Sequence, residues 1–109
     1  MAVSKRVPIP ISIAQGQTTS SPATPAGKTV AAIELPTLTG TSLSVQVLAS
    51  DGVTWIPLYF NDQPVTISSG TARRVALEPS TFFSCESFRV VSNQAEASAR
   101  IIYLHLRDV

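Results

Sequence analysis

The stretch from residue 41 to residue 60 constrains the fold of this chain more than any other part of the sequence. Leu43, Val45 and Val47 alternate there with polar residues, which places them on one face of an extended strand, because successive side chains of a strand point to opposite sides. The pair Asp51-Gly52 separates this strand from a second apolar run. Asp-Gly between two such runs is typical of a β-hairpin, since glycine accepts the positive φ that the turn requires. The stretch therefore predicts a hairpin at the centre of a small all-β domain.

Short runs of β-branched and aromatic residues, bounded by turn residues, recur along the rest of the chain, and no convincing amphipathic helix interrupts them. They predict an antiparallel β-sandwich or jelly roll of about seven or eight strands. Helix is the competing interpretation for 28–35, and 80–85 is either a single helical turn or a loop whose Phe82 and Phe83 close the core. Besides the hairpin, the expected strands are 7–13, 28–35, 65–67, 73–77, 87–92 and 98–107.

The N-terminal region has an apolar stripe, with two prolines on the opposite face of the same segment. Proline cannot donate to a sheet ladder, so this segment is either an edge strand or an extended arm on an apolar surface. Residues 14–27 are rich in Gln, Thr, Ser, Pro and Gly, a composition typical of a loop or tether. We expect an N-terminal arm and loop at 1–27 and a β-sandwich domain at 28–109. The residues expected to bind a partner through the arm are Val7, Ile9, Ile11 and Ile13.

Charge patterning argues against nucleic acid as a partner. Charged residues make up only 14% of the chain and the net charge is +1. A protein that holds nucleic acid by its phosphates normally carries a basic stripe, whereas this chain has two short basic pairs, Lys5-Arg6 and Arg73-Arg74. A weakly charged surface suits burial against partner proteins, including copies of the same chain.

The single cysteine and the hydropathy pattern bear on the compartment. Cys85 alone excludes an intrachain disulfide and a multi-cysteine zinc site, and it is compatible with assembly in a reducing cytoplasm. No run of about 18 apolar residues is present, so we expect no membrane partner. The N-terminus lacks the apolar core of a signal peptide.

Titratable residues form no pattern that indicates catalysis. His105 is the only histidine, lies within an alternating strand segment, and is expected at the surface or in an interface. The carboxylates are scattered through turns and strand ends, and the glycines occur singly. We therefore expect no enzyme, and no catalytic, cofactor-binding or metal-binding residue.

The aromatic residues of the second apolar run leave two interpretations open. Trp55 and Tyr59 fall on one face of an extended strand and, with Phe83 as a third candidate, could form a platform that stacks on sugars. The commoner arrangement in a sandwich of this size buries the tryptophan. We expect Trp55 to share the core with the alternating residues of the first strand, which are Leu43, Val45 and Val47.

Two motifs carry a family resemblance that extends over roughly Ile9 to Arg107. They read S-D-G-V-T-W-I-P-L-Y (50–59) and V-A-L-E-P-S-T-F-F (75–83). The chain resembles small virion proteins of tailed bacteriophages, namely capsid cement or decoration proteins and related head or tail accessory domains. This resemblance implies a jelly-roll or sandwich fold, assembly on the icosahedral shell and often a trimer.

The function implied by the resemblance is that of a structural virion protein that binds and stabilises the phage head shell. Its partners would be the major capsid protein and copies of itself, and it would be located on the capsid surface after assembly in the host bacterial cytoplasm. Two alternatives remain open: a carbohydrate-binding accessory module, and a tail or connector structural protein of the same fold.

Overall fold

The computed structural model describes residues 8–25, 28–82 and 87–108. Within these ranges the protein is all-β, with several antiparallel sheets and one short 3₁₀ helix, η1 (Pro79–Phe82). Ten strands take the place of the seven or eight expected, because some are only two or three residues long. They are β1 (Ile9–Ile13), β2 (Lys28–Leu35), β3 (Ser42–Leu48), β4 (Trp55–Pro57), β5 (Tyr59–Phe60), β6 (Gln63–Pro64), β7 (Thr66–Ser68), β8 (Arg73–Ala76), β9 (Phe88–Ser92) and β10 (Arg100–Asp108).

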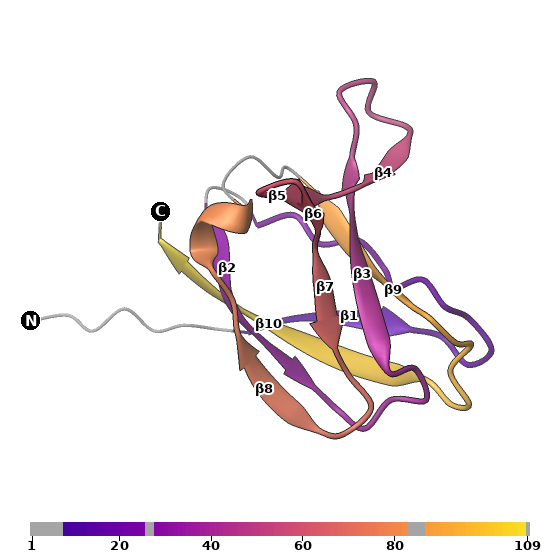
Figure 1. Cartoon of the computed structure of the whole chain (residues 1–109). Helices are drawn as coiled ribbons and strands as arrows, with labels where there is room; N and C mark the ends of the chain where they lie inside the picture. Colours follow the sequence, from indigo (N-terminus) through magenta and orange to yellow (C-terminus); the bar gives the residue numbers. More distant parts are fainter. Residues whose placement is uncertain (1–7, 26–27, 83–86, 109) are drawn as a thin grey trace, which may run out of the picture.

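The strands form two four-stranded sheets and one small hairpin (Figure 1). The first, called here the β10 sheet, has the order β1-β10-β2-β8. In the second, the β3 sheet, β3 pairs with β9 along one edge and with β7 and β4 along the other. Strands β5 and β6 pair only with each other. All of these pairings are antiparallel, and of them only β3–β4 and β5–β6 join strands that are consecutive in the chain.

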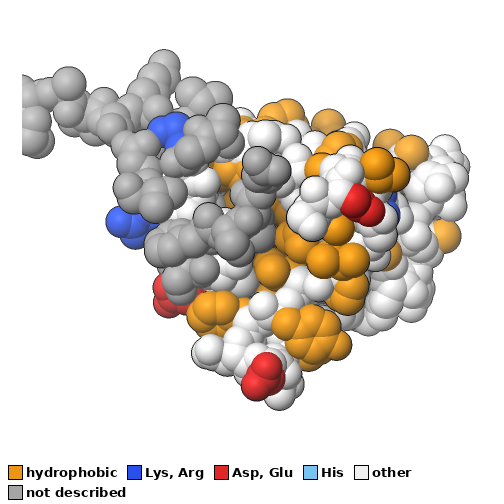
Figure 2. Space-filling model, turned by 90° about the horizontal axis from the view of Figure 1, so that it is seen from above, with side chains coloured by type: hydrophobic (Ala, Val, Ile, Leu, Met, Phe, Trp, Pro, Cys, Tyr) orange, Lys and Arg blue, Asp and Glu red, His pale blue; other side chains and the backbone are white. Residues whose placement is uncertain are grey.

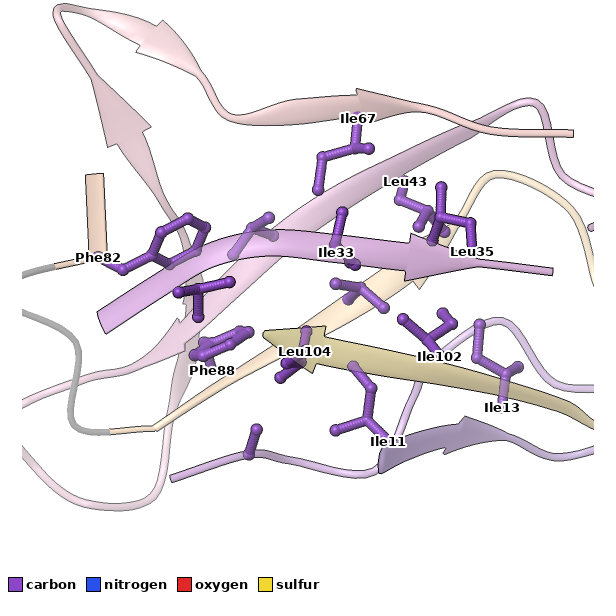
Figure 3. Close-up of a cluster of buried hydrophobic side chains, with 14 of the residues drawn as sticks. Ile11, Ile13, Ile33, Leu35, Leu43, Ile67, Phe82, Phe88, Ile102 and Leu104 are labelled. Carbon is purple, nitrogen blue, oxygen red and sulfur yellow. The ribbon is translucent and has the colours of Figure 1, made fainter. Parts of the chain in front are cut away.

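One hydrophobic core lies between the two sheets, because alternate residues of each strand point inward (Figure 3). Register pairs Val45 of β3 with Val90 of β9, and both are buried. Helix η1 closes one end of this core: the Phe82 ring lies 5.3 Å from that of Phe88. The remainder of the ambiguous segment, 83–85, lies outside the described residues. The largest buried side chains include Phe88, Ile11, Ile13, Ile33, Leu43, Ile102 and Leu104.

The N-terminal strand corrects the expected domain boundary. Residues 9–13 form β1, an edge strand of the β10 sheet, and Ile11 and Ile13 are 1% and 0% exposed. Ser12 N–H points away from β10 and donates to Ser21 Oγ. Pro10 precedes it by two residues and so has the same orientation, which means that its missing N–H costs no ladder bond. The edge-strand interpretation therefore holds, and an arm that offers Ile11 and Ile13 to a partner does not.

Residues 14–25 form a crossing between the two sheets and not a free tether. Single β-bridges join Ile13 to Ser20 and Ala23 to Phe88, and Ser20 N–H donates to the Val90 carbonyl at 2.9 Å. The segment thus supplies hydrogen bonds to the outer edge of β9 and closes that side of the core. A covered edge is protected from pairing with other chains.

A buried carboxylate joins the connections at one end of the sheets. Glu96 is 1% exposed and accepts hydrogen bonds from the backbone N–H groups of Thr39 and Gly40, at 2.8 and 3.0 Å. Ser92 Oγ and Arg100 Nε donate to the same carboxylate at 3.0 and 3.1 Å. Burial acts to raise the pKa of Glu96, but these four donors outweigh it and hold the pKa below its usual value.

Glycine is required at position 40 by the close approach of the chain beneath this carboxylate. A Cβ at Gly40 would overlap Ser92 Oγ, the same hydroxyl that donates to Glu96. Any larger residue must therefore displace the Ser92 side chain and, with it, one of the donors to Glu96.

Truncating the buried edge strand should destabilise the whole domain. Ile13→Ala removes a fully buried side chain, so we expect it to lower the free energy of unfolding by about 2–5 kcal/mol, measured by chemical denaturation. Ser12→Ala is the matched control, because the adjacent Ser12 side chain is exposed and should change stability by no more than about 0.5 kcal/mol. Equal, small effects would indicate that β1 is not part of the cooperative fold.

Glu96→Gln should destabilise the protein in a pH-dependent way. The amide has one acceptor oxygen in place of two, so some of the four donors lose their acceptor and the hydrogen bonds that remain become neutral. We therefore expect a loss of about 1.5–3 kcal/mol at neutral pH. Because the folded-state pKa is depressed, the carboxylate stabilises the fold above the usual glutamate pKa, and this contribution disappears as pH falls through the folded pKa. Denaturation curves of wild type and variant should therefore converge in acid. The exposed Asp62→Asn serves as control and should show no convergence.

Candidate functional site

The side chain of Asp51 caps the turn of the β3–β4 hairpin. Asp51 Oδ1 accepts hydrogen bonds from the N–H groups of Val53 and Thr54, both at 2.9 Å, and Oδ2 accepts one from Thr54 Oγ1 at 2.6 Å. The Thr54 hydroxyl is the largest cause that lowers the pKa of Asp51 to about 2, followed by the backbone donors. Gly52 has a φ of 75°, which confirms the turn that Asp51-Gly52 predicts.

Trp55 lies on the outer face of the β3 sheet, so the prediction that it shares the core is wrong. Register pairs Trp55 with Leu48 and thus aligns it with the outward-facing residues of β3, whereas Leu43 and Val45 face inward. The guanidinium carbon of Arg89 lies 4.5 Å from the centre of the Trp55 ring. Arg89 Nε in turn donates to Gln46 Oε1 at 2.8 Å. One face of the half-buried indole is therefore covered by a cation.

The second predicted platform residue, Tyr59, belongs to a different strand pair. The strand expected over 55–60 is interrupted at Leu58, whose N–H donates to the Val45 carbonyl and whose carbonyl accepts from Val65 N–H. Tyr59 follows in β5 and pairs with β6. Trp55 and Tyr59 therefore do not share one strand face, and the third candidate, Phe83, lies outside the described residues.

The two-residue loop between β5 and β6 turns the chain back on itself. Asn61 and Asp62 both have positive φ, 52° and 60°, which is the conformation of a type I′ hairpin turn. Asparagine and aspartate tolerate this region better than other non-glycine residues. The turn residues were visible in the sequence, but the formation of a separate hairpin was not.

Four large apolar side chains of segment 53–60 are exposed at the end of the protein where the hairpin projects (Figure 1). We call Val53, Ile56, Tyr59 and Phe60 the apolar rim. Val53 is 78% exposed and Tyr59 59% exposed. Figure 2 looks down on this end and shows hydrophobic side chains gathered over the part of it that belongs to the described residues, with isolated acidic groups beside them. The rim is a candidate site for binding another protein.

The predicted arm residues contribute little to the exposed surface. Ile11 and Ile13 are in the core, Ile9 is partly buried against it, and Val7 lies outside the described residues. The stripe that the sequence assigned to a partner therefore packs into the core of its own chain at Ile11 and Ile13. The signal for the rim was the excess of apolar residues in 53–60, because a strand that buries one face leaves the apolar residues of its other face exposed.

His105 lies on the outer face of β10, as expected, but is largely covered. Its side chain is 16% exposed, and its Nε2 is 3.2 Å from Glu34 Oε1. In the described part of the chain, no three His, Cys, Asp or Glu residues are grouped so that they could hold a metal ion. Nor does that part contain a helix long and apolar enough to cross a membrane.

Comparisons of the chain with protein families, curated proteins and solved structures give no match. The interpretation of function therefore rests on the sequence and on the surface geometry.

The position of Trp55 can be tested by fluorescence, because it is the only tryptophan. Arg89→Ala uncovers one face of the indole, so we expect a red-shifted emission and stronger acrylamide quenching, with a stability loss of about 0.5–1 kcal/mol. Arg107→Ala removes an exposed arginine from the other sheet and should leave the emission unchanged. Identical quenching in the two variants would place Trp55 away from Arg89.

Proposed function

We propose that this protein is a structural virion protein, a capsid cement or decoration protein that binds and stabilises the head shell of a tailed bacteriophage. The observation that carries the proposal is the apolar rim on an otherwise weakly charged domain. Large exposed apolar patches on small proteins mark surfaces that bind other proteins. The sequence resemblance to phage head proteins supplies the identity of that partner, the major capsid protein.

The composition of the rim suits a protein–protein contact. Tyr59 and Phe60 are aromatic, and the cores of interfaces are enriched in aromatic residues and depleted of charge. Aromatic anchors also carry a large share of binding energy when a partner desolvates them. A cement protein acts in many copies through such contacts, so it requires no titrating site.

The same proposal includes the assembly and the finer fold. Copies of the protein associate, as a trimer, on the capsid surface after assembly in the host bacterial cytoplasm, without nucleic acid, membrane or enzymatic activity. The two sheets form a β-sandwich of jelly-roll type, which is supported by the inward-facing residues of both sheets that share one core.

A rim variant should lose attachment to the shell while it keeps its fold. We expect Tyr59→Ser/Phe60→Ser to lower occupancy on purified heads by about tenfold or more, because two desolvated aromatic anchors are removed. Occupancy is measured by co-sedimentation and by cryo-electron microscopy of the particles. Ile101→Ser is the matched control, because it removes an exposed apolar side chain from the other surface and should leave occupancy unchanged.

Other outcomes of the imaging would contradict the proposal in defined ways. Few copies at the tail or connector, in place of many over the shell, would assign the protein to the tail or connector class. Absence from the particle, together with a shift in Trp55 emission upon addition of a glycan, would favour the carbohydrate-binding class.

A further inference from the structure

A hollow of about 370 Å³ opens on the outer face of the β10 sheet, remote in sequence from the apolar rim. Its lining residues come from four strands or strand ends: Pro8, Ala31, Ala32, Arg74 and His105. Register explains why they meet: His105 of β10 pairs with Ala32 of β2, which pairs with Ala76 of β8, and Glu34 pairs with Arg74 one row away. Two small alanines form the floor, and a guanidinium and an imidazole form the polar wall.

The floor contains an irregularity of the sheet. The register between β10 and β2 shifts so that His105 opposes Ala32 while Leu106 opposes Val30, and Ala31 is therefore the extra residue of a β-bulge. The Ala31 carbonyl accepts a hydrogen bond from Leu77 N–H at 2.9 Å, which holds the bulge in place. Bulges re-aim side chains and are over-represented beside functional sites.

The guanidinium of Arg74 is oriented by its neighbours. Its side chain is 58% exposed, and its Nη2 lies against the imidazole, 2.7 Å from His105 Nε2 and 2.8 Å from Nδ1, and 3.8 Å from Glu34 Oε1. Among the described residues, Nη1 and Nε of Arg74 have no side-chain or backbone partner. An arginine held at one nitrogen can present its remaining donors to a carboxylate, which it binds in a planar, two-point geometry.

Glu34 shows that a carboxylate is compatible with this position. Its Oε1 lies within 3.2 Å of His105 Nε2, yet half of its side chain is exposed. The Glu34–Arg74 pair at 3.8 Å is long and solvent-exposed, and such pairs contribute little to stability. An incoming carboxylate can therefore compete with Glu34 for the guanidinium at small cost.

We propose that the Arg74–His105 hollow is a binding site for a carboxylate group on a short aliphatic body. The guanidinium of Arg74 accepts the carboxylate, His105 lies beside it, and the methyl groups of Ala31 and Ala32 with the ring of Pro8 contact the aliphatic part. The carboxylate comes either from an acidic side chain of a partner protein or from a small free acid. This site is independent of the apolar rim and of the proposed cement function.

The site can be tested by NMR on the full-length protein with methyl-labelled alanine. Acetate, propionate and N-acetyl-glutamate amide are titrated at constant ionic strength, with N-acetyl-glutamine amide as the neutral control. We expect saturable shifts of the Ala31, Ala32 and His105 signals with dissociation constants on the order of millimolar, given so few ligand atoms. Tighter binding of the blocked glutamate than of acetate identifies a protein side chain as the source, and the reverse order a free acid.

Three variants have different expected effects on the dissociation constant, which separates binding in the hollow from general electrostatic attraction. Arg74→Gln should weaken binding about tenfold or more, because it removes a charged hydrogen-bond donor. Glu34→Gln should tighten binding, because it removes the competing carboxylate. Arg107→Gln loses the same charge from an exposed position on the same strand as His105, and should leave the dissociation constant within about twofold because exposed charges are screened.

The proposal is overturned by either of two results. One is a wild-type titration without saturable shifts at the hollow; the other is equal weakening by Arg74→Gln and Arg107→Gln. Circular dichroism and thermal melting confirm that the variants are folded. Arg74→Lys keeps the charge but not the two-point geometry, so binding intermediate between wild type and Arg74→Gln distinguishes recognition from a change in fold.

Discussion

The arrangement of the two sheets depends most on the hydrogen bonds that the buried Glu96 carboxylate accepts. Its side chain receives donors from Thr39, Gly40, Ser92 and Arg100, while its own backbone bonds to Gly16 and Gln17. Three connections that are distant in sequence therefore meet on one residue. A buried charge is costly unless it is fully hydrogen-bonded, so the loops must close around it together or not at all. This requirement fixes how one end of the β10 sheet sits on the β3 sheet.

Glu96 holds the connections near the start of β3. The other end of β3 continues into a hairpin whose residues are exposed. The β3–β4 hairpin leaves the body after Leu48, stabilised by Asp51 and not by packing against the core. In the segment that follows, Leu58 packs against the core, whereas the four residues of the apolar rim stay exposed. The apolar rim is thus a consequence of topology: two of its residues, Tyr59 and Phe60, form β5, which pairs only with β6.

The rim and the Arg74–His105 hollow differ in the partners they suit. The rim exposes apolar surface, so it suits a protein partner whose contact excludes water from that surface. The hollow offers an oriented guanidinium above small side chains, which favours one charged group of defined geometry. The hollow is lined by residues of the β10 sheet and the rim by residues of the β3–β4 hairpin and of β5, so one can be occupied while the other stays accessible.

The sequence by itself determined the all-β class, the turn at Asp51-Gly52 and the strand predicted at 87–92. It also favoured a strand over a helix at 28–35 and limited the segment around Pro10 to an edge strand or an arm. These are local properties, set by alternation, turn chemistry and proline. Only the tertiary structure decided that Ile11 and Ile13 complete the core and that Trp55 faces outward under Arg89. Alternation says which residues share a face but not which face is buried, and that choice belongs to register between strands distant in sequence. The hollow has the same origin, because the register of β10 and β8 on either side of β2 brings His105 beside Arg74.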